Sequence, residues 1–476
     1  MAGTADAPVQ GEAPQPEEES IFHRVLSRWR RLTTGSVNRR VLGATLVVGS
    51  MTIIIKAISL LKESFVAASF GTGGDYDAFI VALLLPSTIV GILSGSLNAA
   101  LIPTYIEIRD KENKEAAQRL YTTILLWNTI LLGGLTLLMA WTVRLWLPFI
   151  AWGFDPAKLE LTRTIALWSL PLVLLTGFAT TWGAILNAGE RFALVAIAPA
   201  LQPLAIILGL SFFCRAWGIY ALLFGTVLGV LLETVVLGMA LARKGHPLLP
   251  RWHGVTTAFR KVRAQYGACI AAAFLVNGMG LVDQAFASTL GPRSNSALSY
   301  GSKLVGLVLT LGGTALGTAI LPQLSRMVAN NNWTGIRRFL RQYTALILAV
   351  AVPTTVILIL LSTFIVRTMF QNGSFNASDT ALVVRIQIFY LLRIPFSACG
   401  ILVTRTLTAL RANHFLMWTA VVSFTINAAL DYLFIQTYGI AGITLSTSVC
   451  SCIIFLGASY AMYRLLDRRA LESPAA

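Results

Sequence analysis

The chain has 476 residues, of which 56% are hydrophobic and only 12% are charged, and its formal net charge is +16. Soluble globular domains carry about 25% charged residues, so the composition excludes that class and indicates a polytopic membrane protein. About 20 consecutive apolar residues cross a bilayer, and their backbone must satisfy its own hydrogen bonds. The long apolar runs are therefore predicted to be transmembrane helices, and the predicted fold class is all-α.

Twelve such helices are predicted, with a tail at each end of the chain. Residues 1–40 are expected to start as a disordered tail and to continue as an amphipathic helix on the membrane surface or as a solvated basic linker. Residues 467–476 form the second tail. The predicted spans cover residues 41–70, 77–105, 119–148, 160–187, 191–213, 217–242, 264–290, 297–325, 339–370, 379–410, 413–436 and 438–466.

The basic residues collect in alternate loops, and this sets the expected orientation. Lys and Arg are frequent before the first span, in the segment 243–263 and after the last span, whereas the loops 71–76 and 371–379 contain none. Cytoplasmic loops carry the excess of Lys and Arg. Both termini are therefore expected on the cytoplasmic side of a bacterial inner membrane, with lipids and not nucleic acid beside the basic residues.

The two halves of the chain look like one unit used twice. Four glycine, proline or phenylalanine positions of the first half recur in the second half after 219 to 223 residues. This repeat predicts an N-terminal lobe of six spans at 41–242, a cytoplasmic linker at 243–263 and a C-terminal lobe of six spans at 264–466. Parallel repeats are a known transporter design with the substrate site between the lobes. The paired landmarks are Gly71 and Gly291, Pro103 and Pro322, Phe192 and Phe415, and Gly218 and Gly439.

A few charged residues lie inside the apolar spans. In the first span Lys56, Ser59 and Glu63 fall on one helical face, with Lys62 beside it. A charge in hydrocarbon costs roughly 2.5–3.5 kcal/mol on insertion scales, so such residues are functional candidates. Lys303 is the counterpart in the other lobe, and lysines from both lobes in one cavity would attract a phosphate. The alternative is a salt-bridged packing cluster.

Five other charged residues are candidates for the cavity or for coupling to an ion gradient. Arg385 and Arg393 in the tenth span would add positive charge to the cavity. Asp77 opens the second span, where a carboxylate favours the helix N-terminus, and this capping role competes with proton coupling. Asp283 and Asp431 lie deeper and are candidates for ion coupling or for pairing with a lysine.

Patterns for catalysis are missing from the sequence. There is no phosphate-binding glycine loop, no cluster of metal ligands and no nucleophile with a base and an orienting carboxylate. The chain is therefore not expected to be an enzyme or to hold a cofactor. Transport is expected to depend on an ion gradient (Na⁺ or H⁺), on the membrane potential or on the substrate gradient, and the protein is expected to act as a monomer.

Three segments carry a family resemblance, namely SMTIIIKAISLLKESFVAASFGTGGDYDAFIVALLLP, ASTLGPRSNSALSYGSKLVGLVLTLGGTALGTAILPQLSR and MFQNGSFNASDT. They resemble the MurJ/MviN lipid II flippases of the MOP transporter superfamily. A fourth segment, NAALDYLFIQTYGIAGITLST, is similar to a region shared more widely in that superfamily. The resemblance implies a V-shaped cavity that opens alternately to the two sides of the membrane, and an undecaprenyl-diphosphate-linked sugar as substrate.

The resemblance also implies functional positions. The family's basic positions in the first span match Lys56 and Lys62, its acidic neighbour matches Glu63, its second-span aspartate matches Asp77, and its eighth-span arginine matches Lys303. The chain departs from the family where a second-span basic position falls at Val90 or Gly91 and where a glutamate is Gly306. Lysine replaces arginine at the matched basic positions, and twelve spans are predicted where the family usually has fourteen.

Three classes of function are compatible with these observations. The first is a flippase for a lipid-linked glycan, with lipid II as the leading substrate and an exopolysaccharide or O-antigen repeat unit as the alternative. The second is a cation-coupled drug exporter on the same scaffold, although cationic drugs would favour an acidic cavity. The third is a membrane scaffold or a glycan-handling enzyme, which the charges inside the spans and the missing catalytic cluster argue against.

Overall fold

The computed structural model describes residues 37–189, 191–410 and 412–472. The predictions for residues 1–36 lie outside this range. The chain forms two compact units, Met1–Ile54 and Ile55–Ala476. The described part of the first unit, residues 37–54, is the beginning of helix α2. The candidate site and its contacts lie in the second unit.

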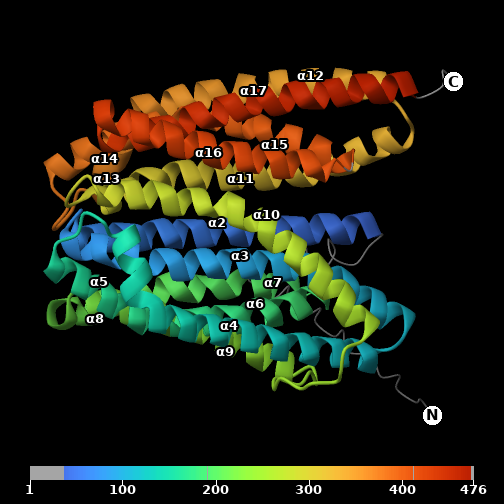
Figure 1. The fold of residues 1–476 in the computed structure, drawn as a ribbon, viewed down its shortest axis with the longest axis horizontal. Coiled ribbons are helices and arrows are strands. Elements are labelled where there is room, and N and C mark those ends of the chain that lie inside the picture. Colours follow the sequence, from blue (N-terminus) through green and yellow to red (C-terminus); the bar gives the residue numbers. More distant parts are fainter. Residues whose placement is uncertain (1–36, 190, 411, 473–476) are drawn as a thin grey trace, which may run out of the picture. The chain divides into compact units, whose positions relative to one another are not determined.

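All secondary-structure elements of the described residues are helices, which confirms the all-α prediction. Eight predicted spans are single helices, and four are divided in two. Figure 1 shows α2 (Val37–Phe70), α3 (Gly74–Lys111), α4 (Lys114–Ile150), α5 (Pro156–Ser169), α6 (Pro171–Ala188), α7 (Phe192–Ile197), η1 (Ala198–Ala200), α8 (Leu201–Trp217), α9 (Ile219–Ala242), α10 (Thr257–Ser288), α11 (Ser294–Ala329), α12 (Trp333–Leu360), α13 (Ser362–Phe370), α14 (Ala377–Leu391), α15 (Ile394–Ala409), α16 (Asn413–Tyr438) and α17 (Ile440–Glu472).

Three of the four breaks coincide with a proline. Pro171 begins α6, Pro199 lies in η1 and Pro395 lies in the first turn of α15. Proline has no backbone N–H and clashes with the preceding turn, so it is tolerated at the start of a helix and interrupts a longer one. The fourth break, at Leu361, has no proline next to it.

Within the described residues, nine helical segments are long and apolar enough to cross a membrane. The protein is therefore a multi-pass membrane protein. The helices α2, α10 and α11 are not among the nine, although their lengths of 34, 32 and 36 residues exceed the roughly 20 that a span needs. The count of twelve spans stays a prediction.

The helices α4, α10 and α14 each begin at a side chain that caps the helix. The Asn113 side chain accepts a hydrogen bond from the Ala116 amide at the start of α4, and Thr256 accepts one from Phe259 at the start of α10. Asn376 forms a capping box with Asp379 at the start of α14. Such caps satisfy amides that the helix leaves without partners.

The repeat is visible in the backbone at its paired glycines. Gly218, between α8 and α9, has φ 52° and ψ −129°, and Gly439, between α16 and α17, has φ 58° and ψ −138°. Gly71 and Gly291 also both have positive φ, at 56° and 95°. Glycine adopts these conformations without the steric cost of a Cβ, so the same turn recurs at the same place in both halves.

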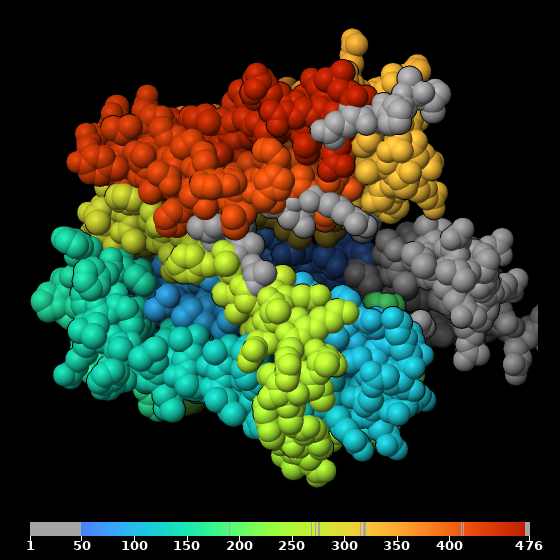
Figure 2. All heavy atoms as spheres, turned by 45° about the vertical axis from the view of Figure 1, so that its right-hand side comes forward, coloured from blue at the N-terminus to red at the C-terminus, as the bar shows by residue number. Residues whose placement is uncertain are grey.

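The helices of the second unit pack in two sets. Helices α3 to α9 contact one another, helices α11 to α17 contact one another, and α10 contacts α3, α4 and α16. Figure 2 shows the yellow-green atoms of α10 lying against the cyan atoms of α3 and α4. Lys261 of α10 is paired with Glu107 of α3. The helix α10 therefore links the two sets.

The two sets share an apolar core at one end of the helices and have separate cores at the other. The shared core joins Tyr76 and Ala78 of α3 to Ala297 and Tyr300 of α11. At the opposite ends of the same helices, Tyr105 of α3 belongs to one core, whereas α11 contributes to a different core through residues 320 and 324. The sets are thus joined at the end where α3 and α11 begin.

Candidate functional site

A cavity of about 410 Å³ lies between α2, α8 and α11. It is bounded by one helix face from each of these elements, so the two helix sets both contribute to its wall. The residues that line it are Lys56, Ser59, Leu60, Lys62 and Glu63 of α2, Gln202, Pro203 and Ile206 of α8, and Ser302, Lys303, Gly306, Leu307 and Thr310 of α11.

Helical spacing explains why these residues meet. On α11, Lys303, Gly306, Leu307 and Thr310 are separated by three, four and seven residues from the first, which puts them on one face. The polar stripe predicted on α2 has the same spacing and faces the same cavity. The structure therefore brings Lys303 of α11 to one wall with Lys56 and Lys62 of α2, which lie far from it in the chain.

The carboxylate of Glu63 lies between two of the lysines. Its Oε1 atom is 2.5 Å from Lys62 Nζ and 2.7 Å from Lys303 Nζ. Glu63 is buried, with 5% of its surface exposed, and a buried carboxylate keeps its charge when cations replace the lost water. The predicted cavity and the alternative of a salt-bridged cluster therefore occur together.

The cavity has an excess of positive charge. It is lined by three lysines and one carboxylate, which leaves two positive charges. Among the described residues, Lys56 has no ion-pair partner. Lysine binds phosphate as a strong point charge, so an anion with two negative charges would neutralise this wall.

Of the positions that depart from the family pattern, Gly306 borders the cavity. A Cβ at Gly306 would meet no atom within 4 Å, so the missing side chain widens the cavity next to Lys303. Val90 is not among the lining residues. The positive charge of the wall thus comes from α2 and α11.

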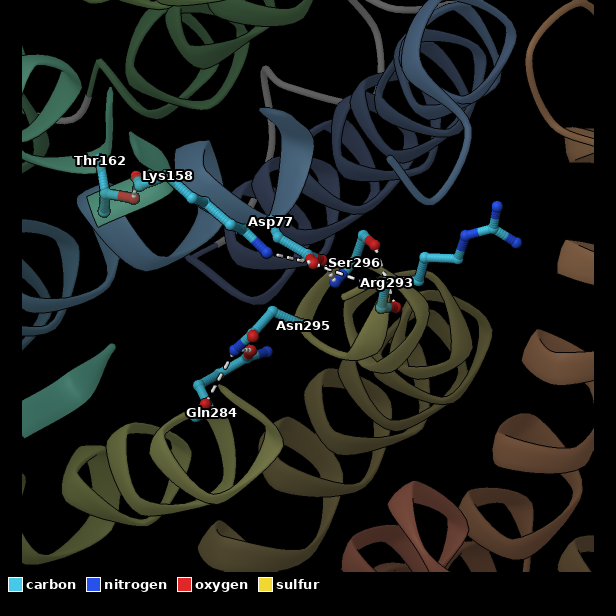
Figure 3. A network of polar contacts seen from close by, with 7 residues as sticks. All are labelled: Asp77, Lys158, Thr162, Gln284, Arg293, Asn295 and Ser296. Carbon is cyan, nitrogen blue, oxygen red and sulfur yellow. Dashed lines mark hydrogen bonds and ion pairs between the residues drawn. The ribbon is translucent and has the colours of Figure 1, made fainter. Parts of the chain in front are cut away.

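Asp77 does not line this cavity and instead holds the N-terminus of α11, as Figure 3 shows. Its fully buried carboxylate accepts hydrogen bonds at 2.7 Å from the backbone amides of Arg293 and Ser296 and is paired at 2.9 Å with Lys158 Nζ of α5. The expected cap of its own helix is wrong, because α3 begins at Gly74 and its N-cap residue, Gly73, receives no side-chain cap. The carboxylate caps a helix of the other set, where the amides and the helix dipole favour it.

A second group of contacts joins the two helix sets beside Asp77. The Thr72 hydroxyl donates to Asp379 at 2.5 Å, and Arg293 Nη1 lies 3.7 Å from the same carboxylate. The Ser374 amide donates to the Ala68 carbonyl at 2.8 Å. A Cβ on Gly373 would come within 2.3 Å of that carbonyl, so glycine permits this backbone approach. The chain is closed at this end by polar contacts as well as by the shared core.

Asp283 and Asp431 form a separate acidic cluster between α10, α16 and α17. Asn427 Nδ2 donates to Asp283 at 2.8 Å and to Asp431 at 3.1 Å, and Asp431 also accepts from Ser446. The two aspartates are 9% and 0% exposed. Neither has a lysine partner among the described residues. Two buried carboxylates around one amide are a place where a bound cation or proton would be stabilised.

The two predicted arginines lie away from the lysine cavity. Arg385 is exposed on α14. Arg393 lies at the break between α14 and α15, where its Nη1 donates to the Tyr390 hydroxyl at 3.0 Å and its Nε to Ser397 at 3.5 Å. Neither is a lining residue. At the break before Pro395, Arg393 therefore contacts residues of both α14 and α15.

Several residues of these sites were missed by sequence reasoning. Asn427 carries a usable signal, because it lies one helical turn before Asp431 and therefore on the same face. Lys158 lies in the first turn of α5, and no sequence pattern links it to Asp77. Gln202 is a single polar residue among prolines and apolar residues, and only the fold brings it to the cavity.

Comparison with known proteins gives the family. The family model described as lipid II flippase MurJ matches residues 66–472. A protein of Synechocystis sp. named "Probable lipid II flippase MurJ" is 25% identical over 436 residues, covering 87% of this chain and 80% of the relative. A solved structure of lipid II flippase MurJ in an inward closed conformation has a TM-score of 0.77 and 20% identity, covering 90% of both chains.

A solved structure from a second transporter family has the same fold. The inward-facing structure of a multidrug resistance MATE family transporter of the MOP superfamily has a TM-score of 0.75 and 12% identity, covering 90% of this chain and all of that one. Identity at this level shows the fold alone. The family itself is shown by the family model, which matches most of the sequence. The chain belongs to the lipid II flippase MurJ family.

Proposed function

We propose that this protein moves lipid II, an undecaprenyl-diphosphate-linked glycan, across the bacterial cytoplasmic membrane for peptidoglycan synthesis. The observation that carries the proposal is the single cavity wall shared by Lys56, Lys62 and Lys303. The family membership supports a transporter and not an enzyme. A basic cavity suits an anionic lipid head group better than a cationic drug, which argues against the exporter alternative.

The lysines hold the diphosphate in this proposal. Two positive charges remain after Glu63 is counted, and the charge of a diphosphate bridge offsets them. Charges attract more strongly in a protein cavity than in water because the effective dielectric constant is lower. Lys56, without an ion-pair partner among the described residues, supplies the first contact, and Lys62 and Lys303 exchange part of their contact with Glu63 for the phosphate oxygens.

Movement occurs by alternating access. The contacts of Asp77, Asp379 and Ser374 close one end between the helix sets. The loops at that end, 71–76 and 371–376, contain no Lys or Arg, so the rule for cytoplasmic loops places them in the periplasm. The described state is then closed toward the periplasm, and both termini lie in the cytoplasm.

The acidic cluster of Asp283 and Asp431 is the proposed coupling site. Its carboxylates are buried and share the Asn427 amide, so a Na⁺ ion or a proton that offsets one of their charges changes the packing of α10 against α16. Because α10 contacts both helix sets, such a change is transmitted to the cavity. Carboxylate and amide oxygens are the ligands that hard cations prefer.

The proposal is tested by depleting the protein in its native cell. Lipid II is expected to accumulate on the cytoplasmic leaflet, because synthesis continues there while export stops. Accumulation of a different lipid-linked repeat unit, with lipid II unchanged, would favour the exopolysaccharide or O-antigen alternative and contradict the assignment of lipid II.

A further inference from the structure

Glu233 is a carboxylate inside α9 that belongs neither to the lysine cavity nor to the acidic cluster. It is the only Asp, Glu, Lys or Arg between Ile219 and Ala242. Its side chain is partly buried, and it has no ion pair or hydrogen-bond partner among the described residues. An ionisable side chain within a membrane span is costly and is a functional candidate by default.

The seam between α8 and α9 shows what Glu233 faces. Glycines close this seam: a Cβ at Gly225 would come within 2.8 Å of the Ile206 Cα atom, and one at Gly229 within 2.5 Å of the Gln202 Cα atom. The two helices are therefore antiparallel, and each step along the seam is about one turn on both of them. One further step places Glu233 opposite η1, which α9 contacts.

The helix is interrupted at η1. Pro199 lies in this short helix and has no backbone N–H to donate. In the preceding helix α7, which is fully described, no residue is buried, and its N-cap residue Arg191 is exposed. Binding sites for coupling ions in transporters occur at interrupted helices of this kind. Glu233 thus lies opposite a break in the helix set α3 to α9.

The helices around α9 provide no counter-charge at the level of Glu233. The helices that contact α9 are α3, α5, α6, η1 and α8. Among their described residues, α6, η1 and residues 78–104 of α3 contain no titratable side chain. The helix α5 packs against the start of α9, in the core that contains Ile219 and Leu222. The remaining titratable groups are Lys158, Glu160 and Arg163 of α5, Cys214 and Arg215 in the last turn of α8, and Tyr220 in the first turn of α9.

We propose that Glu233 is a proton-binding site in the helix set α3 to α9. An isolated carboxylate in apolar surroundings takes up a proton instead of staying ionised. A hard metal cation would need several oxygen ligands, and the described residues of the helices that contact α9 place no second carboxylate at this level. The proton is held on a carboxylate oxygen, and no other bond changes.

The site lies one helix away from the lysine cavity. Gln202 and Ile206, which close the seam against α9, also line that cavity. A protonated Glu233 permits the close packing of α8 on α9, whereas an ionised one requires water in the seam. The protonation of Glu233 therefore acts on the part of the cavity wall that α8 forms. This inference goes beyond the proposed function, and its test needs no substrate.

The test compares two carbodiimides on the full-length protein in lipid nanodiscs. Dicyclohexylcarbodiimide is apolar and reacts with protonated carboxyl groups within the membrane, whereas a water-soluble carbodiimide with glycine ethyl ester modifies carboxyl groups that face water. An ordinary glutamate, with a pKa of about 4.3, is ionised at about pH 7. At this pH, mass spectrometry is expected to find the apolar adduct on Glu233 and the water-soluble adduct on Glu115, which is exposed at the start of α4.

The pH dependence identifies the proton as the ligand. The apolar labelling of Glu233 should fall about tenfold for each pH unit above its midpoint, because the protonated fraction falls by that factor. Glu233→Gln should remove this adduct and leave the labelling of Glu115 unchanged. The proposal is overturned if Glu233 reacts only at the acidic pH of an ordinary glutamate, or if the water-soluble reagent modifies it as strongly as Glu115. Protection by sodium chloride but not by choline chloride would assign the site to a metal cation and also overturn the proposal.

Thermal unfolding gives an independent readout. A carboxyl group that binds its proton more tightly in the folded than in the unfolded protein stabilises the fold at low pH, and this contribution is lost as the pH rises. The Tm of the wild type should therefore fall over the pH range in which the label disappears. Glu233→Gln, which has a similar shape and does not titrate, should lack that fall. Identical Tm profiles for the two proteins would contradict the proposal.

Discussion

The Nζ atom of Lys303 lies 2.7 Å from the Oε1 atom of Glu63, so an ion pair joins α11 to α2 at the wall of the lysine cavity. The two residues are 240 positions apart in the chain and belong to the two halves of the repeat. Lys62 shares the same carboxylate oxygen. An anion that enters the cavity therefore competes with Glu63 for two lysines from different halves, which links binding to the relative position of the helices.

Replacing Lys303 by alanine should reduce lipid transport at least tenfold, because an electrostatic contact of about 1.4 kcal/mol or more with the diphosphate is lost. Lys303→Arg should keep activity, since the positive charge remains. Transport is measured with purified protein in liposomes, and membrane levels are compared for both variants. Equal loss in the alanine and arginine variants at normal levels would indicate a packing role.

Replacing Glu63 by glutamine should increase the affinity of the cavity for inorganic diphosphate, because the lysines no longer have an internal competitor. The variant should also be less stable without anion, by about 3 kcal/mol, since removing one partner of a buried ion pair leaves the other charge uncompensated. Thermal unfolding with and without diphosphate measures both effects. A Tm increase with diphosphate that is no larger than in the wild type would contradict this interpretation.

Asp77→Asn should weaken the closed end of the molecule, because the charge that pairs with Lys158 and caps α11 is lost. The closed end can be followed by a disulfide between Ser69→Cys and Ser374→Cys, whose parent residues are joined by a 3.0 Å hydrogen bond. The five natural cysteines are replaced first. Disulfide yield should fall in Asp77→Asn and remain in Asp75→Asn, an exposed neighbour; an equal yield in both would refute the capping role.

The membrane potential should drive transport, because the exported head group is anionic. Moving one charge across the membrane is worth about 2.3 kcal/mol per 100 mV. Flipping in liposomes is therefore expected to be faster with an inside-negative potential and no pH gradient. No response to potential, with a strong response to a Na⁺ or proton gradient that Asp431→Asn abolishes, would instead assign the driving force to the acidic cluster.

The orientation is tested by reporter fusions. Fusions within residues 71–76 and 371–379 should report the periplasm, and a fusion after Arg468 should report the cytoplasm. The reason is the absence of Lys and Arg from the first two loops and their presence near the C-terminus. One reversed result would break the twelve-span topology, because the repeat fixes the side of each partner loop.

Much of the fold follows from local patterns in the sequence. The length of the apolar runs predicts the membrane-spanning helices. Prolines such as Pro171 and Pro395 mark positions where a long span divides into two helices. The polar stripe of Lys56 and Glu63 was visible because helical spacing is local. These are features that a single helix, or a pair of equivalent helices, imposes.

The features that local sequence patterns do not predict depend on contacts between segments that are distant in the chain. Asp77 has the position of a cap for its own helix, yet its carboxylate binds amides at Arg293 and Ser296. Nothing in the local sequence indicates which helix N-terminus the side chain of a buried aspartate will cap. In the same way Arg393 looks like a cavity residue by its depth, whereas the break before α15 directs it to Tyr390.

The central claim is that the three lysines of one cavity carry lipid II across the membrane. The most direct measurement is the flipping of labelled lipid II in liposomes by the wild-type protein and by a variant with Lys56, Lys62 and Lys303 all changed to glutamine. The wild type is expected to flip lipid II well above the rate in empty liposomes, and the variant at the rate in empty liposomes. Flipping by the folded variant at the wild-type rate, or no flipping by the wild type, would contradict the claim.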